Sequence, residues 1–204
     1  MKRSHDLVHA VAAGRWPAGR GPTGASSSGH TGQLVSAISS FLQSAVERKV
    51  RVARREMGID ITWVTDRIGV GGGIWTAENM ALIAQQGITH IIDMQIEFDD
   101  TPLARAHGIE VCWNPVDDDF EPKPAEVFEL GVGFALAALE EKNAKIFVHC
   151  AAGVHRAPMM TLAVLCALGY SLDDGMDLIV DRRPVADFAE VYIRSVEDFL
   201  QSRV

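Results

Sequence analysis

The chain has 204 residues, of which 48% are hydrophobic, and a formal net charge of −8 at pH 7. This length suits one catalytic domain with an additional segment, and the longest apolar runs fall short of the about 18–20 residues that span a membrane. Residues 1–56 hold nine Lys or Arg and three Asp or Glu, whereas residues 57–204 hold ten and twenty-four. The acidic second part argues against nucleic acid as a partner.

Two different segments precede the acidic part. Residues 1–33 are rich in Gly, Ser, Ala and Pro, which predicts a disordered leader. Their Arg-rich composition would also suit an organelle targeting peptide, but glycine clusters interrupt the amphipathic helix that such a peptide needs, and no secretory signal is present, so we expect a cytoplasmic protein. Residues 34–57 predict an amphipathic helix. Its basic end suits either weak contact with an anionic membrane or packing on the acidic domain, and we favour packing.

Residues 58–204 form the expected catalytic domain, in which short apolar segments alternate with helical patterns. This alternation predicts an α/β fold with a largely parallel central sheet and helices on both faces. We expect strands at 61–64, 68–70, 88–94, 109–113 and 145–149. We expect helices at 76–87, 101–108, 124–142, 157–168, 171–182 and 187–201, with Thr76 and Ser171 as N-terminal caps.

The last expected strand leads into the most informative motif of the chain, H-C-x-x-G-x-x-R, formed by His149-Cys150-Ala151-Ala152-Gly153-Val154-His155-Arg156. If a helix begins near Arg156, the intervening amides must turn inward at a positive helix end and bind an anion. Gly153 permits this turn because glycine tolerates positive φ. Converging amides and a fixed cation favour the thiolate, the form in which Cys150 attacks. The motif therefore predicts a cysteine nucleophile, with residues 151–156 binding a phosphate.

This motif resembles the nucleophile loop of the cysteine-dependent protein tyrosine and dual-specificity phosphatases. An acidic segment, Pro115-Val116-Asp117-Asp118-Asp119-Phe120, lies upstream at the distance where that superfamily carries its general acid. Together with Arg156-Ala157-Pro158, this segment is similar to the regenerating-liver phosphatases, and the alignment makes Asp118 the acid. Asp117 and Asp119 stay open as alternatives because each is only one residue away.

The resemblance implies hydrolysis of a phosphomonoester without a metal or cofactor. Cys150 would accept the phosphoryl group, and Asp118 would protonate the leaving oxygen and then activate water. The loop amides and Arg156 would stabilise the transferring charge. His149 would orient and tune Cys150, whereas His155 either lines the pocket or faces solvent.

Ala157 occupies a position where the superfamily usually has Ser or Thr, whose hydroxyl helps the cysteine to depart. It therefore predicts slow breakdown of the phosphoenzyme. It also keeps open a phosphate-dependent binding module with little turnover, although binding alone needs neither Cys150 nor Asp118. A rhodanese-like sulfurtransferase is disfavoured by the motif spacing and the upstream acid.

The candidate substrates are phosphotyrosine together with phosphoserine or phosphothreonine in proteins, or a small phosphorylated metabolite. Polyphosphorylated lipids are disfavoured because Ala151, Ala152 and Val154 add no cation to the loop.

The other cysteines, Cys112 and Cys166, have no disulfide or zinc spacing, so we expect reduced core residues. Some relatives protect the nucleophile with a second cysteine on a strand. The matching position here is near Met94, so we do not expect that regulation.

Overall fold

The computed structural model describes residues 58–202, and the predicted leader at 1–33 and helix at 34–57 lie outside this range. Strands and helices alternate in the described part, as the sequence predicts. The strands are β1 (Ile61–Trp63), β2 (Ile68–Gly71), β3 (His90–Gln95), β4 (Glu110–Val116) and β5 (Ile146–His149). The helices are α3 (Ala77–Gln85), α4 (Thr101–Arg105), α5 (Ala125–Glu140), α6 (Arg156–Ala167), α7 (Leu172–Arg182) and α8 (Glu190–Gln201).

The strands form one sheet in the order β1-β2-β5-β3-β4. Only the edge strand β1 is antiparallel to its neighbour, and the other pairs are parallel. Strand β5 therefore lies at the centre, and its last residue, His149, pairs with Gly71 on one side and Asp93 on the other. Because parallel strands end at the same edge, the segments that follow β2, β3, β4 and β5 meet beside Cys150.

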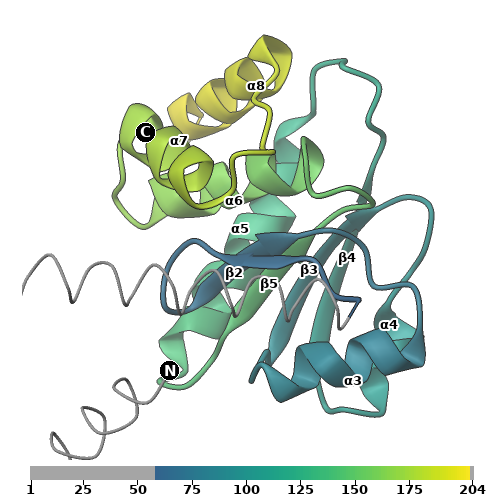
Figure 1. Ribbon diagram of the computed structural model, residues 1–204. Coiled ribbons are helices and arrows are strands. Elements are labelled where there is room, and N and C mark those ends of the chain that lie inside the picture. Colours follow the sequence, from purple (N-terminus) through teal and green to yellow (C-terminus); the bar gives the residue numbers. More distant parts are fainter. Residues whose placement is uncertain (1–57, 203–204) are drawn as a thin grey trace, which may run out of the picture. The chain divides into compact units, whose positions relative to one another are not determined.

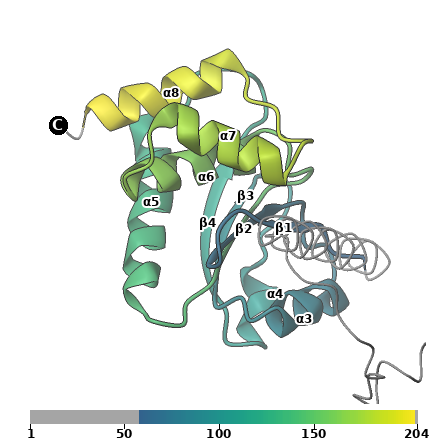
Figure 2. The ribbon, with the colours of Figure 1, turned by 60° about the vertical axis from the view of Figure 1, so that its left-hand side comes forward.

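Helices cover both faces of the sheet, as Figures 1 and 2 show: α3 and α4 lie on one face, and α5 to α8 lie on the other. Ile91 and Phe147 belong to the buried cluster under α3 and α4, whereas their neighbours Ile92 and Val148 belong to the cluster under α5 to α8. Alternate residues of each strand thus face opposite helical layers. All residues of β3 and β5 are buried because helices cover both faces of the sheet, and in β3 these include the polar residues His90, Asp93 and Gln95.

The predicted helix caps are confirmed. Thr76 Oγ1 accepts a hydrogen bond from the Asn79 N–H at 3.2 Å, and Ser171 Oγ accepts one from the Asp174 N–H at 3.1 Å. Each hydroxyl satisfies an amide in the first turn that has no partner within its helix.

Several element boundaries differ from the sequence predictions, and two of these differences have a clear structural setting. Strand β4 continues to Val116 and includes Pro115, which is tolerated because β4 is an edge strand and needs fewer ladder hydrogen bonds. Helix α8 begins at Glu190 rather than at Asp187. The Asp187 N–H donates to the Val154 carbonyl at 2.9 Å, which holds this segment against the loop after Cys150.

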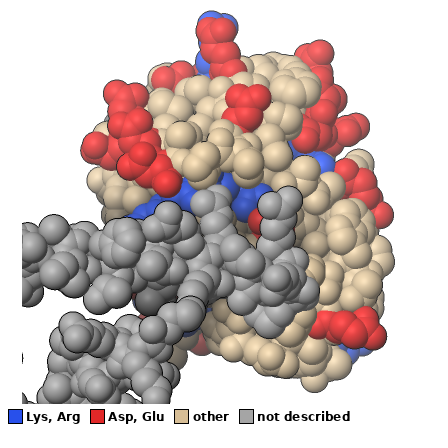
Figure 3. Space-filling view, in the orientation of Figure 1, with Lys and Arg blue, Asp and Glu red and all other residues tan. Residues whose placement is uncertain are grey.

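Charge on the described domain is unevenly placed. On the face shown in Figure 3, Asp and Glu side chains gather in several places, whereas Lys and Arg side chains gather mainly in one band. Within residues 58–202, no helix is both long enough and apolar enough to cross a membrane.

Candidate active site

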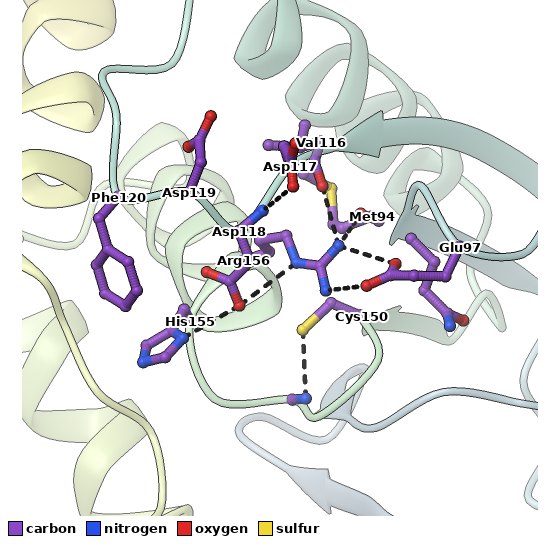
Figure 4. A network of polar contacts seen from close by, with 12 residues as sticks. Met94, Glu97, Val116, Asp117, Asp118, Asp119, Phe120, Cys150, His155 and Arg156 are labelled. Atoms are coloured by element: carbon purple, nitrogen blue, oxygen red, sulfur yellow. Dashed lines mark hydrogen bonds and ion pairs between the residues drawn. The ribbon is translucent and has the colours of Figure 1, made fainter.

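The loop of residues 150–156, the phosphate loop, joins the end of β5 to the start of α6. The Gly153 N–H donates to Cys150 Sγ at 3.2 Å, and Cys150 is only 1% exposed (Figure 4). Gly153 has a φ of +65°, and a Cβ there would lie 2.4 Å from the Gly71 carbonyl carbon, so only glycine fits. The sulfur thus lies beside an inward amide at a helix N-terminus, where a negative charge is favoured.

Arg183, which the sequence analysis did not single out, holds the outer side of this loop. It is 3% exposed, and its guanidinium donates to the carbonyls of Gly153 at 2.7 Å and Ala152 at 3.3 Å. The same group binds both carboxylate oxygens of Asp60, at 2.9 and 2.6 Å. Because two carbonyls are directed at Arg183, the Gly153 amide is free to face the sulfur.

Arg156 is 2% exposed and its guanidinium lies beside Cys150 (Figure 4). Its Nη1 donates to the Val116 carbonyl at 2.9 Å and to Glu97 Oε2 at 3.0 Å, and its Nη2 donates to Glu97 Oε1 at 2.8 Å. A longer bond of 3.4 Å runs to the Met94 carbonyl. The buried Nε has no hydrogen-bond partner. The edge formed by Nε and the second Nη2 hydrogen is therefore available to bind two phosphate oxygens.

Glu97 fixes the charge of this arginine. Burial alone would lower the pKa of Arg156, but the hydrogen bonds to Glu97 and the nearby Cys150 sulfur raise it above its usual value. In turn, the hydrogen bonds from Arg156 lower the pKa of Glu97. The pair thus keeps a permanent cation beside Cys150. Glu97 follows β3 in a segment without a recognisable motif, so the sequence analysis missed it.

The three consecutive aspartates have different surroundings. Asp118 Oδ2 lies 3.7 Å from Arg156 Nε, and the Tyr192 hydroxyl donates to Asp118 Oδ1 at 3.1 Å. Asp119 pairs instead with Lys123, whose hydrogen bond lowers the pKa of that carboxyl. Asp117 is exposed, and its Oδ1 accepts from the Asp118 N–H at 3.0 Å. Of the three, Asp118 is the one that faces the phosphate loop (Figure 4).

His155 lies between two carboxylates. Its Nδ1 is 3.1 Å from Asp118 Oδ2, and its Nε2 is 3.5 Å from Asp187 Oδ2. The ring of Phe120 approaches it edge-on, with 5.0 Å between the ring centroids. With 21% of its side chain exposed, His155 does not simply face solvent, because it contacts the aspartate expected to be the acid.

His149 has its polar contacts away from Cys150. Its Nε2 lies 2.9 Å from Asp100 Oδ2 and 3.8 Å from Asp93 Oδ1, and all three side chains are fully buried. Its ring stacks on Phe147 with a centroid distance of 5.1 Å. Burial raises the pKa of Asp93 to about 6. Through His149, this polar group adjoins Cys150 in the chain.

The raised pKa of Asp93 predicts a pH-dependent stability. A carboxyl that binds its proton more tightly in the folded protein than in the unfolded chain loses stabilising free energy as pH rises from about 4 to about 6. We expect the unfolding free energy of the wild type, relative to Asp93→Asn, to fall over this interval. Urea unfolding of both proteins at several pH values measures it, and a constant difference would contradict the prediction.

Cys112 and Cys166 are not in disulfides, as expected. Burial raises the pKa of the Cys112 thiol to about 11 and also raises that of Cys166, so both stay protonated at neutral pH and are poor nucleophiles. Ala157, in the first turn of α6, is fully buried and brings no hydroxyl to the site.

Comparisons with known proteins point to a family of phosphatases. A family model described as dual specificity phosphatase, catalytic domain, matches residues 73–201. Protein-tyrosine-phosphatase MKP1 of Arabidopsis thaliana is 26% identical over 183 residues, which cover 85% of this chain and 22% of that protein. Human protein tyrosine phosphatase type IVA 3 is 30% identical over 103 residues, which cover 50% of this chain and 58% of that protein. The chain thus spans less than two thirds of each of these relatives.

Solved structures show the same fold. The crystal structure of PTPMT1 superposes with a TM-score of 0.62 at 17% identity, covering 70% of this chain and 94% of that one. A mouse putative dual specificity phosphatase complexed with zinc tungstate gives a TM-score of 0.60 at 22% identity, covering 70% and 87%.

Proposed function

Because the chain belongs to the dual specificity phosphatase catalytic-domain family, we propose that it hydrolyses phosphomonoesters through a cysteinyl-phosphate intermediate on Cys150. One observation carries this proposal: the Cys150 sulfur, the Arg156 Nε that has no hydrogen-bond partner and the carboxylate of Asp118 lie close together beside the phosphate loop (Figure 4). These are a nucleophile, a phosphate-binding cation and a proton donor. Such a set suits phosphoryl transfer, in which positioning and charge stabilisation do most of the catalytic work.

In the first step, the Cys150 thiolate attacks phosphorus while Arg156 and the inward amides of the loop bind the equatorial oxygens. Asp118 gives its proton to the leaving oxygen, which departs as an alcohol or phenol. In the second step, Asp118 takes a proton from water as the water attacks phosphorus, and the Cys150 thiolate departs. Ala157 offers no hydrogen bond to that departing sulfur, so the second step is the slow one.

We propose phosphotyrosine as the main substrate, with phosphoserine or phosphothreonine also accepted, in the cytoplasm. The acidic composition of residues 57–204 disfavours highly anionic ligands. Three unpaired cysteines support a reducing compartment. A small phosphorylated metabolite is an alternative substrate, since the loop contacts need only a phosphoryl group.

A second candidate function is phosphate-dependent binding with little turnover, which Ala157 favours. The bidentate Glu97–Arg156 pair would serve binding equally well. A binding module, however, would not need a carboxylate such as Asp118 beside Arg156.

Hydrolysis of matched phosphotyrosine, phosphoserine and phosphothreonine peptides by the purified full chain tests the proposal. We expect turnover by the wild type and by the matched control Cys166→Ser, and none by Cys150→Ser. Phosphate bound equally by all three proteins without turnover would support the binding module instead. Turnover that survives Cys150→Ser would exclude covalent catalysis by this residue.

A further inference from the structure

His155 is the residue of the phosphate loop that the catalytic scheme above does not use. One side of its ring faces Asp118, the proposed acid. Its Nδ1 lies 3.1 Å from Asp118 Oδ2, and the same oxygen lies 3.7 Å from Arg156 Nε. Oδ2 is therefore placed between the imidazole and the guanidinium edge that is open to phosphate. A proton on this oxygen can reach either His155 or the leaving oxygen of a bound substrate.

The other carboxylate oxygen is already occupied. The Tyr192 hydroxyl donates to Asp118 Oδ1 at 3.1 Å and accepts the Phe120 N–H at 3.0 Å. Burial raises the pKa of Tyr192 to about 12, so this hydroxyl keeps its proton at any working pH. Tyr192 thus fixes the orientation of the Asp118 carboxylate and leaves Oδ2 as the oxygen that exchanges a proton.

The backbone at Phe120, next to this group of side chains, is in a strained conformation. Phe120 has a φ of +58°, a left-handed conformation that a non-glycine residue adopts only when its surroundings impose it. Its ring stacks on Tyr192 at 5.8 Å and meets His155 edge-on at 5.0 Å. The ring therefore packs beside the His155–Asp118 contact and Tyr192.

The titratable groups that face His155 come from separate elements. Asp118 belongs to the segment after β4, Asp187 precedes α8, Tyr192 lies on α8, and Arg156 opens α6. Lys123 lies over the outer side of the Tyr192 ring. A protonated imidazole donates from both nitrogens and can bind both carboxylates at once, whereas a neutral imidazole has one N–H. Each ring nitrogen of His155 therefore has a carboxylate oxygen near enough to accept a hydrogen bond from a protonated imidazole.

From this geometry we propose that His155 is the proton partner of Asp118, a positioning residue that holds the proton which Asp118 delivers to the leaving group. The inference rests on the proposed phosphatase function and deepens it. Before reaction His155 is an imidazolium with a proton on each ring nitrogen, and Asp118 is a carboxylate. As the leaving oxygen develops negative charge, Nδ1–H gives its proton to Oδ2, and Oδ2 gives a proton to the leaving oxygen. In the second step, a proton from the attacking water passes through Oδ2 back to Nδ1, so each cycle restores the starting state.

The consequence is an acid that works at neutral pH. A lone carboxyl is mostly ionised at pH 7, whereas an imidazole exchanges its proton between about pH 5 and 8. We expect turnover of an alkyl phosphate, which needs a protonated leaving group, to persist to neutral pH in the wild type.

His155→Asn tests this proposal because the amide can still donate toward Asp118 but cannot carry an extra proton. The measured quantity is kcat/KM for an alkyl phosphate between about pH 5 and 8. The value for His155→Asn should match that of the wild type near pH 5 and be lower by about tenfold or more at neutral pH and above. An activated aryl phosphate, which needs no protonation, should show little change. His107→Asn, at an exposed histidine after α4, is the matched control and should leave both profiles unchanged.

Two results would overturn the proposal: an unchanged pH profile in His155→Asn, or an equal loss at every pH, which a merely structural role would give. A readout that needs no turnover separates the proposal from the proposed function. The imidazole ¹⁵N shifts of His155 in the intact protein at pH 7 report which ring nitrogen carries a proton. We expect protons on both ring nitrogens in the wild type, and a neutral imidazole, whichever nitrogen keeps its proton, would contradict the proposal even if phosphatase activity is found.

Discussion

Replacing Arg156 with lysine should lower kcat/KM for an aryl phosphate by about 10³-fold, because removing one preorganised donor to a transition-state oxyanion typically costs about 10²–10³-fold and the guanidinium edge supplies two. A lysine ammonium is a single point charge. It cannot contact Glu97, the Val116 carbonyl and two phosphate oxygens at the same time. Steady-state kinetics of the purified variant measures the loss.

The matched control for this prediction is Arg194→Lys, because Arg194 is an exposed residue of α8 that pairs with Glu190. It should keep wild-type activity. Circular dichroism and thermal unfolding of both variants separate a folding defect from a catalytic one, since Arg156 is buried. Retention of more than a tenth of the activity in a folded Arg156→Lys protein would remove this residue from phosphate binding.

The second large effect is expected for Asp118→Asn. An asparagine keeps the size of the side chain but has no acidic proton, so we expect kcat/KM for an alkyl phosphate, which reports the first step, to fall by about 10²–10⁴-fold, the usual contribution of general acid catalysis. A nitrophenyl phosphate has a good leaving group and should lose less than about tenfold in kcat/KM. The ratio of the two losses is the measured quantity.

Asp117→Asn and Asp119→Asn are matched controls within the same segment. Asp119 is paired with Lys123 and Asp117 is exposed, so both variants should keep the wild-type ratio for the two substrates. A larger selective loss in either of them would transfer the role of the acid to that residue. Equal losses for both leaving groups in Asp118→Asn would show that Asp118 acts on structure instead.

Much of the fold follows from local patterns in the sequence. Strand β5 is recognisable from the apolar run Ile146-Phe147-Val148, because helices cover both of its faces. Thr76 and Ser171 mark helix starts because their hydroxyls bond to amides three residues later. Gly153 indicates the turn of the phosphate loop because only glycine fits there. Each of these signals lies within a few residues of the structure that it specifies.

The partners of the site residues could not be predicted in the same way. Glu97 reaches Arg156 because β3 and β5 are neighbours in the sheet. Arg183 reaches the phosphate loop from the end of α7, and Tyr192 reaches Asp118 from α8. Such pairs join residues that are far apart in the chain and meet only through tertiary packing. Local sequence patterns therefore do not reveal which residues will be in contact. Sequence spacing alone also left three aspartates equivalent, whereas their separate partners distinguish them.

The central claim is that Cys150 carries the phosphoryl group during turnover. Rapid quenching of the wild-type protein with an activated aryl phosphate, followed by intact-mass measurement and fragmentation of the peptide that contains the phosphate loop, tests it most directly. We predict one added phosphoryl group located on Cys150, which accumulates because Ala157 does not assist the second step, and no adduct on Cys150→Ser. Steady turnover by the wild type with no adduct at any quench time, or an adduct located on His149 or His155, would contradict the account.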